Sequence, residues 1–248
     1  MASRSNFDLA DIQAVVFDLM GTCTDWKTAI TSAMSSCLPL CQVLPPDERA
    51  TLAQQWRSGF FAEIHDRFSK GLPGEDIDIT HRRVLDQLVA QNPTLGASLQ
   101  DEHREQLVRS WHDQVAWPDS IAAIEQLKKS CMVVVLANGT TRLQLDIVRS
   151  SGLGFHMLFS SQLLGLTKPS PDIYLKALSL LGVEPAQSLM VAAHAYDLRA
   201  AKTTGMRTAY IRRHTEDDHE DMALVKNEFD LFLDGERPLH SLASLFRR

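Results

Sequence analysis

Short apolar runs alternate with amphipathic stretches along most of the chain, and the first apolar run ends in an acid. Ala14-Val15-Val16-Phe17 is rich in β-branched and aromatic residues, and it is followed by Asp18 and by a turn residue, Gly21. This run predicts a buried strand over about 13–18. A single acid after a strand often only caps a loop. In an open α/β sheet, however, ligands bind beyond the carboxyl ends of the strands, so Asp18 is a candidate site residue.

From Trp117 onward the pattern changes regularly between strand and helix. We predict strands over 131–137, 157–160, 189–193, 207–211 and 231–233. A first predicted helix ends near residue 129. Further helices are predicted over 141–151, 171–181 and 195–204, and a last one closes the chain. This alternation predicts an α/β fold with a doubly wound, parallel, Rossmann-like sheet.

The stretch between the first strand and this alternation is helical in character. Residues from about 26 to 114 show three or four amphipathic stretches and almost no strand signal. One begins after Pro45-Pro46-Asp47-Glu48, where proline and acids suit a helix start, and others cover 80–91 and 101–111. We therefore expect residues 25–114 to form an all-helical cap domain, inserted into a core of residues 1–24 and 115–248.

Composition narrows the class of protein. With 248 residues, 44% hydrophobic and 23% charged, the chain has the make-up of an ordinary globular protein. Its formal net charge of -6 argues against a nucleic-acid partner or an anionic membrane, and no apolar stretch is long enough to span a bilayer. The start, Met1–Asp8, has no apolar signal core, so we expect a cytoplasmic protein. The cysteines have no metal or redox spacing and are expected to be reduced thiols: Cys23, Cys37, Cys41 and Cys131.

An acidic stretch containing histidine, His214–Asp221, follows the predicted strand at 207–211. It could belong to a metal site. Charge runs between secondary-structure elements normally face water, so we expect a solvated loop instead.

Polar side chains follow several predicted strands, at the edge where the ends of parallel strands meet. Besides Asp18 they are Asn138, Lys168 with Tyr174 in the following helix, and His194, Tyr196 and Asp197. A carboxylate beside a lysine stays ionised, as a carboxylate nucleophile requires. Attack by Asp18 on carbon or phosphorus leaves an ester or acyl phosphate, and Asp197 or His194 is placed to help water open it.

These segments resemble the haloacid dehalogenase superfamily over nearly the whole chain. The matching motifs are Phe17–Thr22, Leu136–Gly139, Lys168-Pro169 and the loop that ends in Asp197. In that superfamily the phosphatases carry a second Asp two residues after the nucleophile and an extra acid four residues before the final Asp. Here these positions are Met20 and Ala193. Without a general acid and one metal ligand, the resemblance argues against a phosphatase.

The remaining pattern is similar to the type II 2-haloacid dehalogenases, which are metal-free enzymes with a helical cap. The matching residues are Asp18 as the nucleophile, Thr22, Trp56-Arg57 with Arg57 receiving the halide, Asn138, Lys168, Tyr174 and Asp197. The resemblance implies no cofactor and a possible homodimer. It also implies a small-molecule substrate, contacted by Leu19, Met20, Thr22, Trp56, Tyr174 and Tyr196.

The chain departs from this pattern at four positions. Met20 replaces a Tyr, Ala137 and Ala192 replace Ser residues, and His194 replaces an Asn. Each lost hydroxyl removes a hydrogen bond that is typically worth about 1 kcal/mol. We therefore expect the acid-binding site to be weaker than the nucleophile and halide sites, and a different or larger substrate to be possible. Met20 is expected to shape the pocket.

The sequence thus predicts that Asp18 displaces halide from carbon two of a 2-haloacid, with Arg57 and Asn138 meeting the leaving anion. Water oriented by Asp197, with help from Lys168 or His194, then opens the ester. For His194 three roles stay open: a base, a polar contact or a structural histidine. Two alternatives remain: a related hydrolase acting on another electrophile such as a secondary metabolite, and an inactive protein that uses the fold for binding.

Overall fold

The computed structural model describes residues 8–246, which form two compact units. One contains the chain up to Asp25 together with residues 116–248, and the other is Trp26–Val115. The Met1–Asp8 start, interpreted above as free of a secretory signal, lies outside the described residues except for Asp8. Over the described part of the chain, no helix is both long and apolar enough to cross a bilayer.

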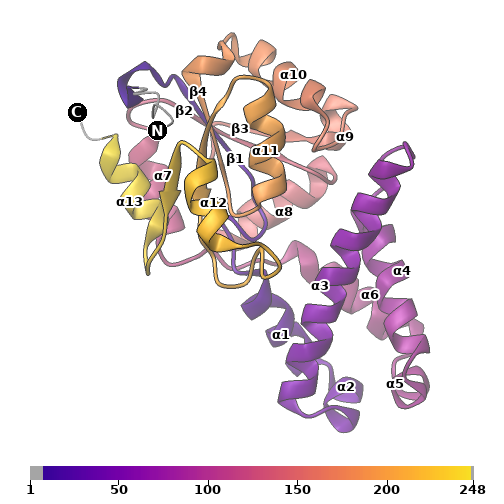
Figure 1. The fold of residues 1–248 in the computed structure, drawn as a ribbon. Coiled ribbons are helices and arrows are strands. Elements are labelled where there is room, and N and C mark those ends of the chain that lie inside the picture. The colour runs from indigo at the N-terminus through magenta and orange to yellow at the C-terminus, as the bar shows by residue number, and fades with distance from the viewer. Residues whose placement is uncertain (1–7, 247–248) are drawn as a thin grey trace. The chain divides into compact units, whose positions relative to one another are not determined.

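The first unit is built on a six-stranded, fully parallel sheet with the order β3-β2-β1-β4-β5-β6 (Figure 1). The strands are β1 (Ala14–Phe17), β2 (Met132–Ala137), β3 (Met157–Ser160), β4 (Ser188–Ala192), β5 (Arg207–Ile211) and β6 (Leu231–Leu233). The predicted parallel α/β sheet is confirmed. The order runs outward from β1 in one direction and from β4 in the other, so the topological switch point lies between β1 and β4.

Helices cover the sheet because each strand is followed by an amphipathic stretch. They are α7 (Ser120–Leu127), α8 (Thr141–Ser151), α9 (Ser161–Leu164), α10 (Pro171–Leu181), α11 (Ala195–Thr203), α12 (Met222–Glu228) and α13 (Pro238–Leu245). On one face Val16, Val134 and Met190 pack with α10, α11 and α12 in a single apolar cluster. The central strands β1 and β4 are buried along their whole length. Their carboxyl ends are therefore held in fixed positions.

The second unit is helical, with six α-helices where the sequence predicts three or four stretches. They are α1 (Trp26–Ser36), α2 (Leu38–Val43), α3 (Pro46–Ser69), α4 (Ile77–Ala90), α5 (Pro93–Ser98) and α6 (Asp101–Arg109). Aromatic rings fill its interior: Trp111 stacks on Trp26 at 5.8 Å between ring centroids and meets Trp56 edge-on at 5.3 Å. Such pairs add about 0.5–1.5 kcal/mol each beyond the area they bury.

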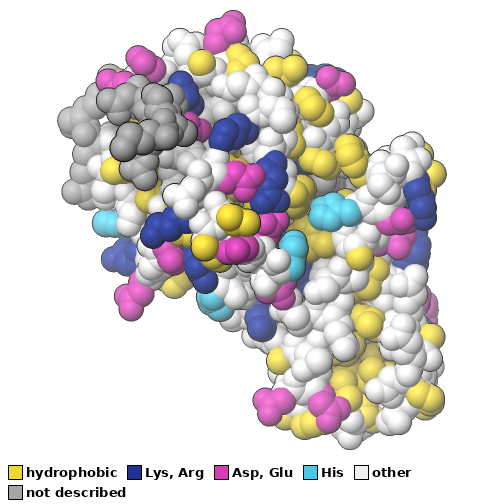
Figure 2. Space-filling model, viewed as in Figure 1, with side chains coloured by type: hydrophobic (Ala, Val, Ile, Leu, Met, Phe, Trp, Pro, Cys, Tyr) yellow, Lys and Arg dark blue, Asp and Glu magenta, His cyan; other side chains and the backbone are white. Residues whose placement is uncertain are grey.

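Charged side chains of both signs lie on the surface of the first unit. In the view of Figure 2, Lys and Arg are interspersed with Asp and Glu over this unit. One such network joins Arg199 on α11 to Glu220 and Glu228, at 2.7 Å each.

Candidate active site

Asp18 stands directly after β1 and is held by its own loop and by the neighbouring strand. Its backbone N–H donates to Val191 O on β4 at 3.0 Å, and its side chain is buried. The Thr22 hydroxyl donates to Asp18 Oδ2 at 2.8 Å and accepts from the Ala193 N–H at 2.8 Å. The loop after β1 is thus tied to the end of β4, and the direction of the Asp18 carboxylate is fixed.

Lys168 joins two carboxylates at the same edge of the sheet. Its buried Nζ lies 2.8 Å from Asp18 Oδ1 and 2.5 Å from Asp197 Oδ2. Asn138, predicted to meet the leaving anion, uses both ends of its amide on the backbone of Lys168. Its Oδ1 accepts from the Lys168 N–H at 2.9 Å and its Nδ2 donates to Lys168 O at 3.1 Å. In the structure Asn138 therefore positions Lys168.

The charges of Asp18 and Lys168 stabilise one another. Burial alone would raise the pKa of Asp18, but Lys168 and His194 hold it well below its usual value. Burial alone would lower the pKa of Lys168, and Asp18 with Asp197 raises it above the usual lysine value. Asp18 is consequently an ionised, poorly hydrated carboxylate, which is the state that a nucleophilic attack requires.

Asp197, in the first turn of α11, is fully buried behind Lys168. Tyr174 of α10 donates from its hydroxyl to Asp197 Oδ1 at 2.5 Å. Burial raises the pKa of Asp197 above its usual value, against the opposing effect of Lys168. Tyr174 is predicted to contact substrate, but its side chain is fully buried, so in this structure it supports Asp197.

His194 lies between two carboxylates, and one of them is missing from the sequence-based prediction. Its Nδ1 is 3.1 Å from Asp18 Oδ2, and its Nε2 is 2.7 Å from Glu216 Oε2. Burial alone would lower the pKa of His194, but hydrogen bonds to Asp18 and Glu216 raise it to about 10. A histidine that is protonated in this way donates from both ring nitrogens, and here each nitrogen faces a carboxylate oxygen.

The prediction of a solvated loop for His214–Asp221 is therefore wrong for two of the loop's residues. Thr215 and Glu216 are buried, and the Thr215 hydroxyl donates to Glu216 Oε1 at 2.8 Å. Asp217 accepts from the Ala195 N–H at 2.6 Å. A buried cation, His194, offsets the cost of burying an acid here. The useful signal was the position of this loop: it follows β5, whose carboxyl end lies at the same edge as that of β4.

The other candidates of the first unit differ in how exposed they are. Leu19 is buried, whereas Met20 and Tyr196 are partly exposed. The Tyr196 ring lies 5.9 Å from the His194 ring. Ala192 is fully buried in the apolar cluster. Its departure from the family's Ser consequently says little about substrate binding.

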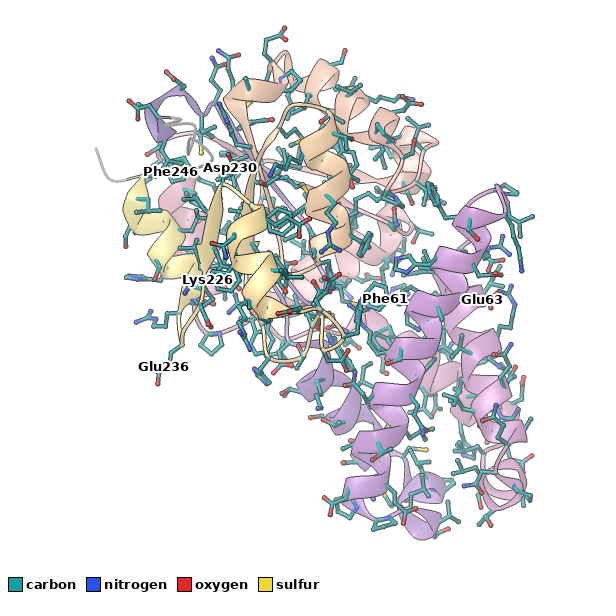
Figure 3. All side chains as sticks on the ribbon, viewed as in Figure 1. Phe61, Glu63, Lys226, Asp230, Glu236 and Phe246 are labelled. Carbon is teal, nitrogen blue, oxygen red and sulfur yellow. The ribbon has the colours of Figure 1, made fainter. Side chains whose placement is uncertain are left out.

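Trp56 and Arg57 belong to α3 of the helical unit, and both are buried. Trp56 Nε1 donates to His81 O at 2.9 Å. The Arg57 guanidinium lies over the ring of Phe61 at 4.4 Å and near that of Trp26 at 5.3 Å; Phe61 is labelled on the ribbon in Figure 3. Cation–π contacts of this kind attract the guanidinium to the ring faces and help to fix its direction.

A divalent metal does not fit this arrangement. Lys168 and His194, both cationic, each lie beside one oxygen of Asp18 and would repel a divalent cation bound there. Met20 and Ala193 offer no oxygen ligand in their side chains, and hard cations require oxygen ligands. Among residues 8–246, no group of three or more His, Cys, Asp or Glu side chains is arranged to hold a metal ion.

Comparison with known proteins points to one family. A family model described as "haloacid dehalogenase-like hydrolase" matches residues 12–205. The crystal structure of an L-2-haloacid dehalogenase is 31% identical, with a TM-score of 0.79, over 93% of this chain and 99% of that chain. The (S)-2-haloacid dehalogenase 2 of Pseudomonas sp. (strain CBS-3) is 24% identical over 96% of this chain and 94% of its own length.

Phosphatases are among the relatives as well. The N-acetylmuramic acid 6-phosphate phosphatase of Pseudomonas aeruginosa is 26% identical over 84% of this chain and 86% of its own length. The match of the family model over most of the sequence, the parallel sheet and the acid after β1 all agree. The chain belongs to the haloacid dehalogenase-like hydrolases.

Proposed function

We propose that this hydrolase removes halide from a small 2-haloacid, with the Asp18 carboxylate as the nucleophile and without a metal ion. One observation carries the proposal: a buried, ionised Asp18 lies between the cations Lys168 and His194 at the switch point of the sheet. A carboxylate that is fixed and poorly hydrated is suited to displacement at carbon.

The reaction has two steps. Asp18 forms a bond to carbon two of the substrate while the carbon–halogen bond breaks, and the halide leaves with its electron pair. Water then opens the ester, with Asp197 as the group that takes the water's proton and passes it to the product oxygen. Its raised pKa and its contact with Lys168 support this role. Arg57 remains the predicted acceptor of the halide, from the resemblance.

Independence from a metal ion is supported by the charges around the nucleophile. Phosphoryl transfer in this family's phosphatases relies on a second Asp at the position of Met20, and a methionine has no acidic proton to give to a leaving group. Lys168 and His194 supply beside Asp18 the positive charge that a metal would supply. Assembly as a homodimer and a cytoplasmic location remain predictions from the sequence.

The test is halide release from (S)-2-chloropropionate and chloroacetate by the wild type and by Asp18→Asn, with a chelator present. We expect halide and 2-hydroxy acid from the wild type only. Arg199→Gln serves as a control and should keep full activity, because it changes a surface ion pair in which the arginine side chain is 42% exposed. Release of phosphate from phosphate esters on adding Mg²⁺, without any halide release, would refute the proposal.

A further inference from the structure

The two oxygens of Asp18 have different hydrogen-bond partners. Oδ1 accepts from Lys168 Nζ, whereas Oδ2 accepts from Thr22 Oγ1 at 2.8 Å and faces His194 Nδ1 at 3.1 Å. Each carboxylate oxygen has two lone pairs. Oδ2 is therefore saturated, and Oδ1 keeps a lone pair for attack on the substrate. In the resulting ester Oδ1 links to the substrate carbon, and Oδ2 is the carbonyl oxygen.

The hydrogens of both donors to Oδ2 are fixed in direction. Thr22 Oγ1 accepts from the Ala193 N–H, so its own hydrogen goes to Asp18. His194 has a carboxylate oxygen at each ring nitrogen, and a neutral imidazole would turn one bare nitrogen toward an anion. The doubly protonated ring donates at both ends. Oδ2 thus has one neutral and one charged donor.

Glu216 is held so that it can keep His194 in this state. Its Oε1 accepts from Thr215 Oγ1 at 2.8 Å, which leaves Oε2 for His194 at 2.7 Å. Its carboxylate also packs directly on Gly21, where an added Cβ would meet the carboxyl carbon at 2.6 Å. The side chain is buried, so its carboxylate is shielded from water.

We propose that His194 and Thr22 form the oxyanion site for hydrolysis of the Asp18 ester, and that Glu216 is the positioning residue that holds His194 as a charged donor. The inference rests on the proposed function, because it concerns that reaction's second step. Donors placed in advance where negative charge develops commonly give the largest single contribution to catalysis.

The atoms balance as follows. Water oxygen adds to Cγ of Asp18, one water proton passes to Asp197, and the carbonyl electron pair moves onto Oδ2, which His194 and Thr22 stabilise. The carbonyl then re-forms, the Cγ–Oδ1 bond breaks, and the departing oxygen takes the proton from Asp197. The product is a 2-hydroxy acid. Asp18, now carrying the water oxygen, loses its remaining proton to solvent.

The groups that set the charge of His194 come from several elements. Asp18 follows β1, Glu216 and Asp217 follow β5, and Tyr196 lies on α11 with its ring near His194. Lys168 binds the opposite oxygen of Asp18. Esterification removes the charge of Asp18, so in the intermediate Glu216 is the anion in direct contact with His194. Loss of that charge should therefore affect the second step most.

The experiment follows halide and 2-hydroxy acid by rapid quench with (S)-2-chloropropionate, together with the mass of the intact protein. In Glu216→Gln we expect a halide burst equal to the enzyme, followed by ester hydrolysis slowed at least tenfold. In His194→Ala we expect hydrolysis slowed about 100-fold, the usual effect of removing one oxyanion donor. Glu220→Gln, in the same loop but paired with Arg199, should show no burst.

A pH profile separates this role from a structural one. The rate of ester hydrolysis should fall as the pH rises. In Glu216→Gln this fall should occur at a lower pH than in the wild type, because His194 loses its proton more easily. If Glu216→Gln does not fold, Thr22→Val removes the other donor and should also accumulate ester. Equal slowing of both steps, or no ester in either variant, would overturn the inference while leaving the proposed function intact. No halide from the wild type would overturn both.

Discussion

Gly21 offers a direct way to move Glu216 without changing it. Gly21 has a φ of +87°, and a Cβ added there would lie 2.6 Å from the Glu216 carboxyl carbon. Ordinary contact begins at 3.4 Å, so Gly21→Ala must shift the carboxylate by 3.4 minus 2.6, or 0.8 Å. The 2.7 Å bond to His194 would stretch to about the limit of a hydrogen bond.

Gly205 provides the matched control. Its φ of +92° is close to that of Gly21, but its added Cβ would meet only Pro185, at 3.5 Å. Both alanine variants should lose about 1–3 kcal/mol from backbone strain. Gly21→Ala should lose about 1.5–3 kcal/mol more, the usual worth of a hydrogen bond to a charged group. For a chain of this size the extra loss corresponds to a Tm lower by about 3–12 °C.

The assay compares Tm by calorimetry and the rate of halide and 2-hydroxy acid formation in the two variants. Gly21→Ala should accumulate the Asp18 ester as Glu216→Gln does, whereas Gly205→Ala should turn over like the wild type. Equal Tm and equal activity in the two variants would refute the reasoning, because backbone strain alone would then account for the whole loss of stability in Gly21→Ala.

Three other changes test the buried charges. Lys168→Met removes the cation between two carboxylates. It should lower the unfolding free energy by about 3–5 kcal/mol in denaturant melts and abolish halide release. Tyr174→Phe removes the hydrogen bond to Asp197 and should cost about 1.5–3 kcal/mol, and unchanged unfolding would contradict the assignment. The pKa of His194, raised from 6.5 to about 10, adds stability that is fully present below pH 6.5 and is lost as pH rises through 10. In His194→Asn the unfolding free energy should depend less on pH between these two values. An unchanged slope of unfolding free energy against pH would count against a protonated His194.

Much of the sheet could be predicted because its central strands β1 and β4 are buried along their whole length, and most strands read as short apolar runs. The strand at 157–160, the helix at 141–151 and the strand at 207–211 have the predicted bounds. The helical unit was harder. Its α1 contains Thr, Ile and Ser residues with weak helix preference, and it is stabilised by packing of Trp26 and Ile30 in the interior.

At the candidate site the sequence could predict that Asp18 and Lys168 lie close together, because each stands at a strand end or before a helix. It could not identify Glu216, since an acid within a charged run normally faces water. Only the fold reveals that β5 lies next to β4, which brings that loop over His194. Periodicity carries no information of this kind about contacts between distant segments.

His194 and Glu216 are best understood as one feature of the site. In the dehalogenases that the chain resembles, a neutral Asn occupies the position of His194. A protonated histidine there adds a positive charge within 3.1 Å of the nucleophile, which stabilises the carboxylate and by itself would slow its attack on carbon. Glu216 offsets part of that charge while Asp18 is ionised. In the proposed Asp18 ester, the same pair is a fixed dipole aimed at the carbonyl oxygen, so we expect one arrangement to restrain the first step and favour the second.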